Sequence, residues 1–94
     1  MFTHIVFFKL KDRNNTKKAK ELLLSMEGKI SFLKEIKVGE DVVHSQRSYD
    51  IALITKFDSK EDMDNYQVNP VHVNEVVKYL KPMLEGSASV DFEE

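Results

Sequence analysis

Three histidines and one tyrosine are the residues of this sequence best suited to moving protons: His4, His44, Tyr66 and His72. An imidazole with an ordinary pKa of about 6.5 can act as a general base at neutral pH, and a phenol can donate a hydrogen bond. His72 is the strongest candidate for a base, because it follows Pro70, where the chain turns into its last predicted helix. The alternative is a histidine near a helix start that is hydrogen-bonded to backbone or to solvent.

The other candidates also have structural interpretations. His4 shares a strand face with Val6 and Phe8, so it could be a core histidine that needs a hydrogen-bond partner. Tyr66 lies on the same predicted helix side as Met63, so it could be a core aromatic residue with a solvated hydroxyl. His44 lies in a polar loop, where we expect it to be solvated.

Cofactor-dependent chemistry has no signal in the sequence. The chain has no cysteine, which excludes a disulfide scaffold, an iron–sulfur cluster, a thiolate zinc site and a cysteine nucleophile. The histidines lack a metal-binding spacing such as HxxxH, and no GxGxxG, GxxxxGK or GxSxG motif is present. We therefore expect no metal and no organic cofactor, and any catalysis would be acid–base chemistry by side chains.

Charge and hydropathy also limit the partners. Lysine and arginine number 14 against 16 acidic residues, a net charge of −2, and no aromatic residues interleave the lysines in 17–20. We therefore expect that lysine group to be a solvated helix surface and not a nucleic-acid site. The acidic group in 61–64 is explained by the positive end of a helix. The apolar run 5–8 is too short to cross a membrane and no secretion signal is recognised, so we expect a cytoplasmic protein.

Four strands and two helical regions, the second of them broken at Pro70, are predicted to position these side chains within one domain, residues 1–94. Strand-like segments have aromatic and β-branched residues in alternation, and helical segments have apolar residues three and four apart. The predicted strands are 2–10, 34–43, 49–57 and 87–93, with a bend or bulge at Gly39 and a loop at 44–48. The first predicted helix is 16–28, ending at Gly28. A second helix starts within 58–62, with Ser59 as a possible cap, and is broken at Pro70, after which helix 73–84 follows. This order, β-α-β-β-α-β, predicts an α+β ferredoxin-like fold with a four-stranded antiparallel sheet and helices on one face.

Two predicted strands are apolar on both faces, which suggests a second chain. Two helices can cover only one face of such a sheet, yet the opposite face carries large apolar groups. These are Ile5, Phe7, Ala52 and Ile54. An exposed apolar patch of this kind usually marks an interface, so we predict a homodimer through this sheet face. The alternative is that these strands are apolar by propensity and that loops half cover the far face.

At this level of detail the chain resembles a known family, the stress-responsive dimeric α/β-barrel (Dabb) domain. The resemblance runs from Phe2 to Phe92 and rests on three stretches: HIVFFKLKD (4–12), YDIAL through FDSKE (49–61) and YQVNPVH (66–72). It implies a ferredoxin-like subunit whose sheet pairs with a second subunit to close a barrel. The resemblance also implies a homodimer with a small apolar pocket per subunit, which binds a small metabolite. It does not imply a particular reaction, because most members of the family have none assigned.

Some plant members that resemble this chain are polyketide cyclases. There a strand-one histidine, a helix tyrosine and the last histidine of Tyr-x-x-His-Pro-x-His line a pocket, positions that correspond to His4, Tyr66 and His72. The resemblance thus implies, as the alternative function, a cofactor-free lyase in which His72 removes a proton next to a carbonyl and Tyr66 donates a hydrogen bond. The sequence departs from that motif at Asn69, which replaces the first histidine, so we expect weak or absent activity on a cyclase-type substrate.

Overall fold

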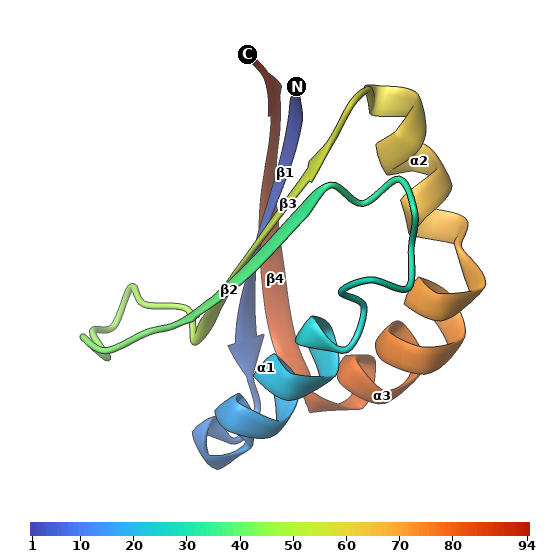
Figure 1. Cartoon of the computed structure of the whole chain (residues 1–94). Coiled ribbons are helices and arrows are strands. Elements are labelled where there is room, and N and C mark those ends of the chain that lie inside the picture. Colours follow the sequence, from blue (N-terminus) through green and yellow to red (C-terminus); the bar gives the residue numbers. More distant parts are fainter.

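The predicted strands and helical regions are all present in the computed structural model, which describes residues 1–94 (Figure 1). In chain order the elements are β1 (Phe2–Leu10), η1 (Arg13–Asn15), α1 (Thr16–Leu24), β2 (Glu35–Glu40), β3 (Ile51–Phe57), α2 (Lys60–Val68), the π-helix η2 (Val71–Val77), α3 (Lys78–Leu80), η3 (Lys81–Met83) and β4 (Leu84–Glu93). The strand order is β2-β3-β1-β4 with every neighbouring pair antiparallel. This is the ferredoxin-like fold, with the helices on one side of the sheet.

The strand register divides the side chains of the sheet into two sets. In β1, Phe2, His4, Val6 and Phe8 point toward the helices, because residues of alternate parity in a strand share a face. The partners opposite them in β3 are Phe57, Thr55, Leu53 and Ile51, all of which are buried. The prediction that this face of β1 looks toward the helices is confirmed.

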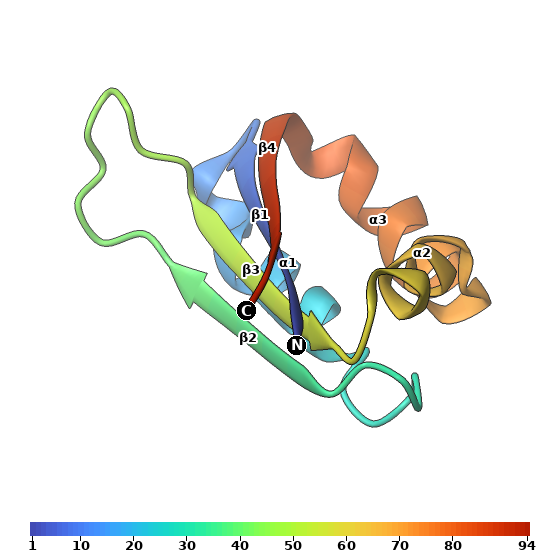
Figure 2. The ribbon, with the colours of Figure 1, turned by 90° about the horizontal axis from the view of Figure 1, so that it is seen from above.

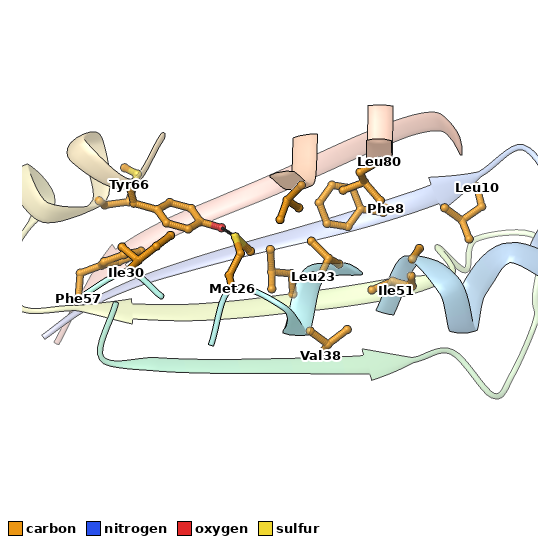
Figure 3. Close-up of a cluster of buried hydrophobic side chains, with 14 of the residues drawn as sticks. Phe8, Leu10, Leu23, Met26, Ile30, Val38, Ile51, Phe57, Tyr66 and Leu80 are labelled. Atoms are coloured by element: carbon orange, nitrogen blue, oxygen red, sulfur yellow. Dashed lines mark hydrogen bonds between the residues drawn. The ribbon is translucent and has the colours of Figure 1, made fainter. Parts of the chain in front are cut away.

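The core lies between this sheet face and the helices (Figure 3). Ala19, Leu23 and Met26 of the first predicted helical stripe are all buried against it. Tyr66 and Phe57 are the largest fully buried side chains, and their rings lie 5.1 Å apart between centroids. The stripe on α1 and the aromatic residue on α2 therefore fix how both helices pack on the sheet.

The opposite sheet face has no helix over it (Figure 1). Ile5, Ala52 and Ile54 are half-buried there, and Phe7 is 37% exposed. β4 adds further apolar residues to this face, since Val90 pairs with Ile5 and is 55% exposed. The loop between β2 and β3 extends away from the rest of the chain (Figures 1 and 2).

Several predicted boundaries were wrong where turns replace regular structure. The first helix ends at Leu24, and Gly28, with φ of 79°, lies in the turns that follow. Asp12 caps the 3-10 turn before this helix by accepting from the Asn14 amide at 2.9 Å. Ser59 caps α2 as predicted, accepting from the Asp62 amide at 3.2 Å.

The strands also differ from the predicted segments. Gly39 pairs with Ala52 in regular register, so it is not a bulge; the irregularity lies between Lys9 and Leu10, opposite an extra residue in β4. β4 begins at Leu84, in place of the predicted helix end, and Gly86 lies inside that strand. The predicted last helix is a π-helix followed by short α and 3-10 turns. No helix of the protein is both long and apolar enough to span a bilayer.

Candidate functional site

A cleft of about 450 Å³ lies between the helix-covered face of the sheet and the segment that runs from α2 to the start of β4. Sixteen residues line it, and ten of them are hydrophobic. His4, Tyr66 and His72 are all among them, so the structure brings the three candidate residues to one cavity. A mainly apolar wall with a few convergent polar groups is the usual form of a small-molecule site.

His4 is held by partners on both ring nitrogens. Its Nδ1 is hydrogen-bonded to Oδ1 of Asp91 on the adjacent strand β4, the residue that pairs with it in the sheet. Its Nε2 lies 3.3 Å from the side-chain nitrogen of Gln67 at the end of α2. Since a carboxylate only accepts, Nδ1 carries a proton and donates it to Asp91, while Nε2 faces the Gln67 amide. The buried imidazole is therefore oriented, with its hydrogen-bonding capacity satisfied.

His72 lies in the π-helix, a type of turn that is frequent at functional sites. Asn69 sets its start, because the Asn69 side-chain oxygen accepts from the Val71 amide at 2.9 Å. The Nδ1 of His72 donates to the backbone oxygen of Gln67 at 3.1 Å, which leaves Nε2 as the free basic nitrogen. Burial lowers the pKa of His72 below its ordinary value, and repulsion from His4 lowers it further, whereas the Gln67 carbonyl opposes the shift.

Tyr66 packs between the two imidazoles. Its ring centroid lies 4.3 Å from that of His72 and 6.3 Å from that of His4. The hydroxyl donates to the sulfur of Met26 at 3.8 Å, a weak acceptor (Figure 3). Burial raises the pKa of the Tyr66 phenol above its usual value, so at neutral pH the group is protonated and can serve as a donor but not as a base.

Sequence reasoning missed Asp91 and Gln67, which link the candidates. Asp91 lies with Ser87 and Ser89 on the helix side of the sheet, opposite His4 of β1. The antiparallel pairing of β1 with β4 is the feature from which Asp91 could have been identified. Gln67 touches both histidines, one through its side chain and one through its backbone oxygen.

His44 lies outside this group. It sits in the exposed β2–β3 loop with a positive φ of 56°, and its backbone amide donates to the Asp41 carboxylate at 2.6 Å. Its ring Nδ1 is 3.3 Å from the same carboxylate. His44 therefore stabilises a turn, and its ring is partly solvated as predicted.

Solved structures with the same fold include proteins from bacteria and a plant. A dimeric protein of unknown function and ferredoxin-like fold from Bacteroides fragilis is 32% identical, with a TM-score of 0.84, over 99% of this chain and 95% of that one. A dimeric ferredoxin-like protein of unknown function from Thermobifida fusca is 24% identical, with a TM-score of 0.84, over 99% and 90% of the two chains. The hydroxynitrile lyase of Passiflora edulis is 21% identical, with a TM-score of 0.79, over 97% and 90%. At 24% and 21% identity, the last two similarities establish the fold alone.

No curated protein matches this chain. The family model of the stress responsive A/B barrel domain, Dabb, matches residues 2–94, which is nearly the whole sequence. That match agrees with the strand order and with the three sequence stretches that suggested the resemblance. The protein therefore belongs to the stress-responsive A/B barrel (Dabb) domain family.

Proposed function

We propose that this protein is a homodimer in which each subunit binds a small, largely apolar metabolite. The cleft of about 450 Å³ between sheet and helices carries this proposal. Its size falls within the usual range for small-molecule sites, and its wall is mainly hydrophobic. The polar groups of His4, Gln67 and His72 gather at one part of the cleft, where they can orient a polar group of the ligand.

The dimer is supported by the uncovered face of the sheet. Ile5, Phe7, Ala52 and Ile54 form an apolar surface there, and Val90 extends it. A second sheet packed on this surface would remove it from water, at roughly 25 cal/mol per Å² of apolar area. The similar proteins from Bacteroides fragilis and Thermobifida fusca are described as dimeric. The two clefts would lie on the outer sides of such a dimer, each within one subunit.

A neutral fluorescent probe, N-phenyl-1-naphthylamine, tests the binding site directly. We expect its fluorescence to rise on binding to the wild type and to be largely lost in Ser89→Trp, because Ser89 lines the cleft and is exposed, so the indole can occupy the cavity without disturbing the core. Glu85→Trp is the matched control, since Glu85 is exposed in the same strand but does not line the cleft. Equal binding by wild type and Ser89→Trp would contradict a site in this cleft.

A second function, a cofactor-free cyclase-like lyase, is favoured by the geometry at His72. Its Nε2 is free, its pKa is lowered and it is neutral at pH 7, which are the properties of a general base. In such a reaction Nε2 takes a proton from the carbon next to a carbonyl. The Tyr66 hydroxyl donates to the carbonyl oxygen as negative charge develops there, exchanging its weak sulfur acceptor for a stronger one.

Turnover of β-keto compounds and hydroxynitriles by wild type and His72→Gln tests this function. A positioned base contributes roughly 10²–10⁴-fold to the rate, so we expect a loss of that size in the variant. Because Asn69 replaces a histidine of the cyclase-like motif, we expect the wild-type rate to be low. Equal rates in both proteins would remove His72 from the mechanism, and no turnover of any compound would leave binding as the function.

A further inference from the structure

The charge of the cleft wall restricts the chemistry of its ligand. Among the sixteen lining residues there is no aspartate or glutamate, and Lys81 is the one with a permanent charge. We propose that the ligand is an apolar carboxylate whose carboxyl group binds at Lys81. This inference rests on the proposed function, because it specifies the ligand of the same cleft.

Lys81 lies at the end of the cleft opposite the histidines. It begins η3, which leads directly into β4, and the lining residues that follow in that strand are Leu84, Ser87, Ala88 and Ser89. His4 pairs with Asp91 further along β4, about 13 Å from Ser87 at roughly 3.3 Å per residue. Figure 1 shows the same separation, with α3 near the start of β4 and α2 near its other end.

The polar groups at the Lys81 end are available to a ligand. The Lys81 ammonium has no carboxylate within 4.0 Å, whereas several other lysines, including Lys29 and Lys56, are paired in this way. Ser87 and Ser89 are exposed and line the cleft. An ammonium and two hydroxyls are donors that suit the two oxygens of a carboxylate.

The wall between the two ends is apolar. Val6 and Phe8 of β1 face Val76 and Leu80 of the helical segment across the cleft. A ligand with its carboxylate at Lys81 would place its hydrocarbon body along this wall. Its far end would then reach His4 and His72, so any reaction there would occur remote from the carboxylate.

The proposal is tested with two ligands that share a body and differ only in charge, decanoate and decan-1-ol. Each is titrated against the protein carrying N-phenyl-1-naphthylamine, which is neutral, and displacement gives both affinities. We expect decanoate to bind about three- to fivefold more tightly than decan-1-ol, the effect of an exposed ion pair, and the preference to shrink at high salt. We expect no preference in Lys81→Met, and full preference in Lys81→Arg.

Lys78→Met is the matched control, because Lys78 is an exposed lysine of the same helical segment that does not line the cleft. It should keep the wild-type preference. Equal affinity for both ligands in the wild type, or an unchanged preference in Lys81→Met, would overturn the carboxylate inference and leave the binding site standing. Failure of both ligands to displace a bound probe would overturn the inference alone, whereas a wild type that binds no probe would overturn the proposed function and the inference with it.

Discussion

The two faces of the sheet are built from the same strands, but only one of them is fully packed within the subunit. On the helix-covered face Phe8, Ile51 and Phe57 are buried by the chain's own helices, and the polar residues His4 and Thr55 have hydrogen-bond partners. The far face carries residues of similar hydrophobicity that stay partly exposed. One face therefore forms the core and the cleft within the subunit. The apolar residues of the other face would be buried only by contact with a second chain.

The difference between the faces separates the residues expected to control folding from those expected to control association. The residues that pack the core and line the cleft lie on the helix-covered face, where most large side chains are surrounded by other parts of the same chain. In the proposed dimer, the residues that decide association lie on the far face, where burial would depend on a second chain. Substitutions on the two faces should consequently have separable effects on stability and on oligomeric state.

The largest effect is expected on the far face, for Ile54→Glu. Two isoleucines per dimer, each already half-buried in the subunit, would lose roughly 1.5–3 kcal/mol of apolar burial, and two carboxylates would have to be buried without partners. Sedimentation equilibrium at micromolar concentration should give about twice the 10.9 kDa chain mass for wild type and a monomer for the variant. Lys17→Glu, an exposed change on α1, should remain dimeric. A monomeric wild type would refute the association.

The next effect is expected on the helix-covered face, for Phe57→Ala. Phe57 has no exposed surface, so we expect a loss of about 3–5 kcal/mol in the free energy of unfolding. Urea unfolding should show this loss at every protein concentration. Phe7→Ala, on the far face where Phe7 is exposed, should instead destabilise most at high concentration, where we expect the wild type to be dimeric. If both variants depended on concentration in the same way, the two faces would not differ as described.

A smaller effect is expected for Asp91→Ala. The buried His4 ring would lose its acceptor at Nδ1, which costs roughly 1–3 kcal/mol. Asp64→Ala is the comparison, because Asp64 makes an exposed ion pair with Lys60 and its loss should change stability little. Equal unfolding midpoints for Asp91→Ala and wild type would mean that the pair does not stabilise the fold.

The smallest effect is expected from pH at His72. The pKa of His72 is lower in the folded protein than in the unfolded chain, so the unfolded chain binds the proton more readily. The free energy of unfolding should therefore fall as the pH drops below about 6.5. An NMR titration should place the His72 midpoint below that value, and His72→Gln should flatten the fall in stability. A midpoint at or above 6.5 would contradict the burial of this ring.

Much of the fold could be predicted because each signal was local. The alternation in 2–10 and 49–57, the stripe of Ala19, Leu23 and Met26 and the cap at Ser59 depend on neighbouring residues. The π-helix could not be predicted, since its apolar spacing is also compatible with an α-helix and tertiary packing decides between them. The start of β4 was misplaced for a similar reason: Leu84 fits a helical stripe as well as a strand.

The site could be predicted only in part. His4, Tyr66 and His72 were identified from residue chemistry and a resemblance, and they do line one cleft, although their role in any reaction stays a prediction. Asp91 was missed, because its importance depends on which strand lies beside β1 and on the parity of their pairing. Such information comes from contacts between distant segments and is absent from any short window of sequence.

The pairing of β1 with β4 also has a kinetic consequence. His4 and Asp91 are 87 positions apart, and the strands that carry them join residues from opposite ends of the described chain. Closing so long a loop costs conformational entropy before the contacts between the two strands can offset that cost. Folds rich in distant contacts therefore form slowly. During synthesis, Asp91, the partner that orients His4, is added 87 residues after His4 itself. The other helices and strands can form earlier, but the oriented imidazole of the cleft arises only when this final strand docks.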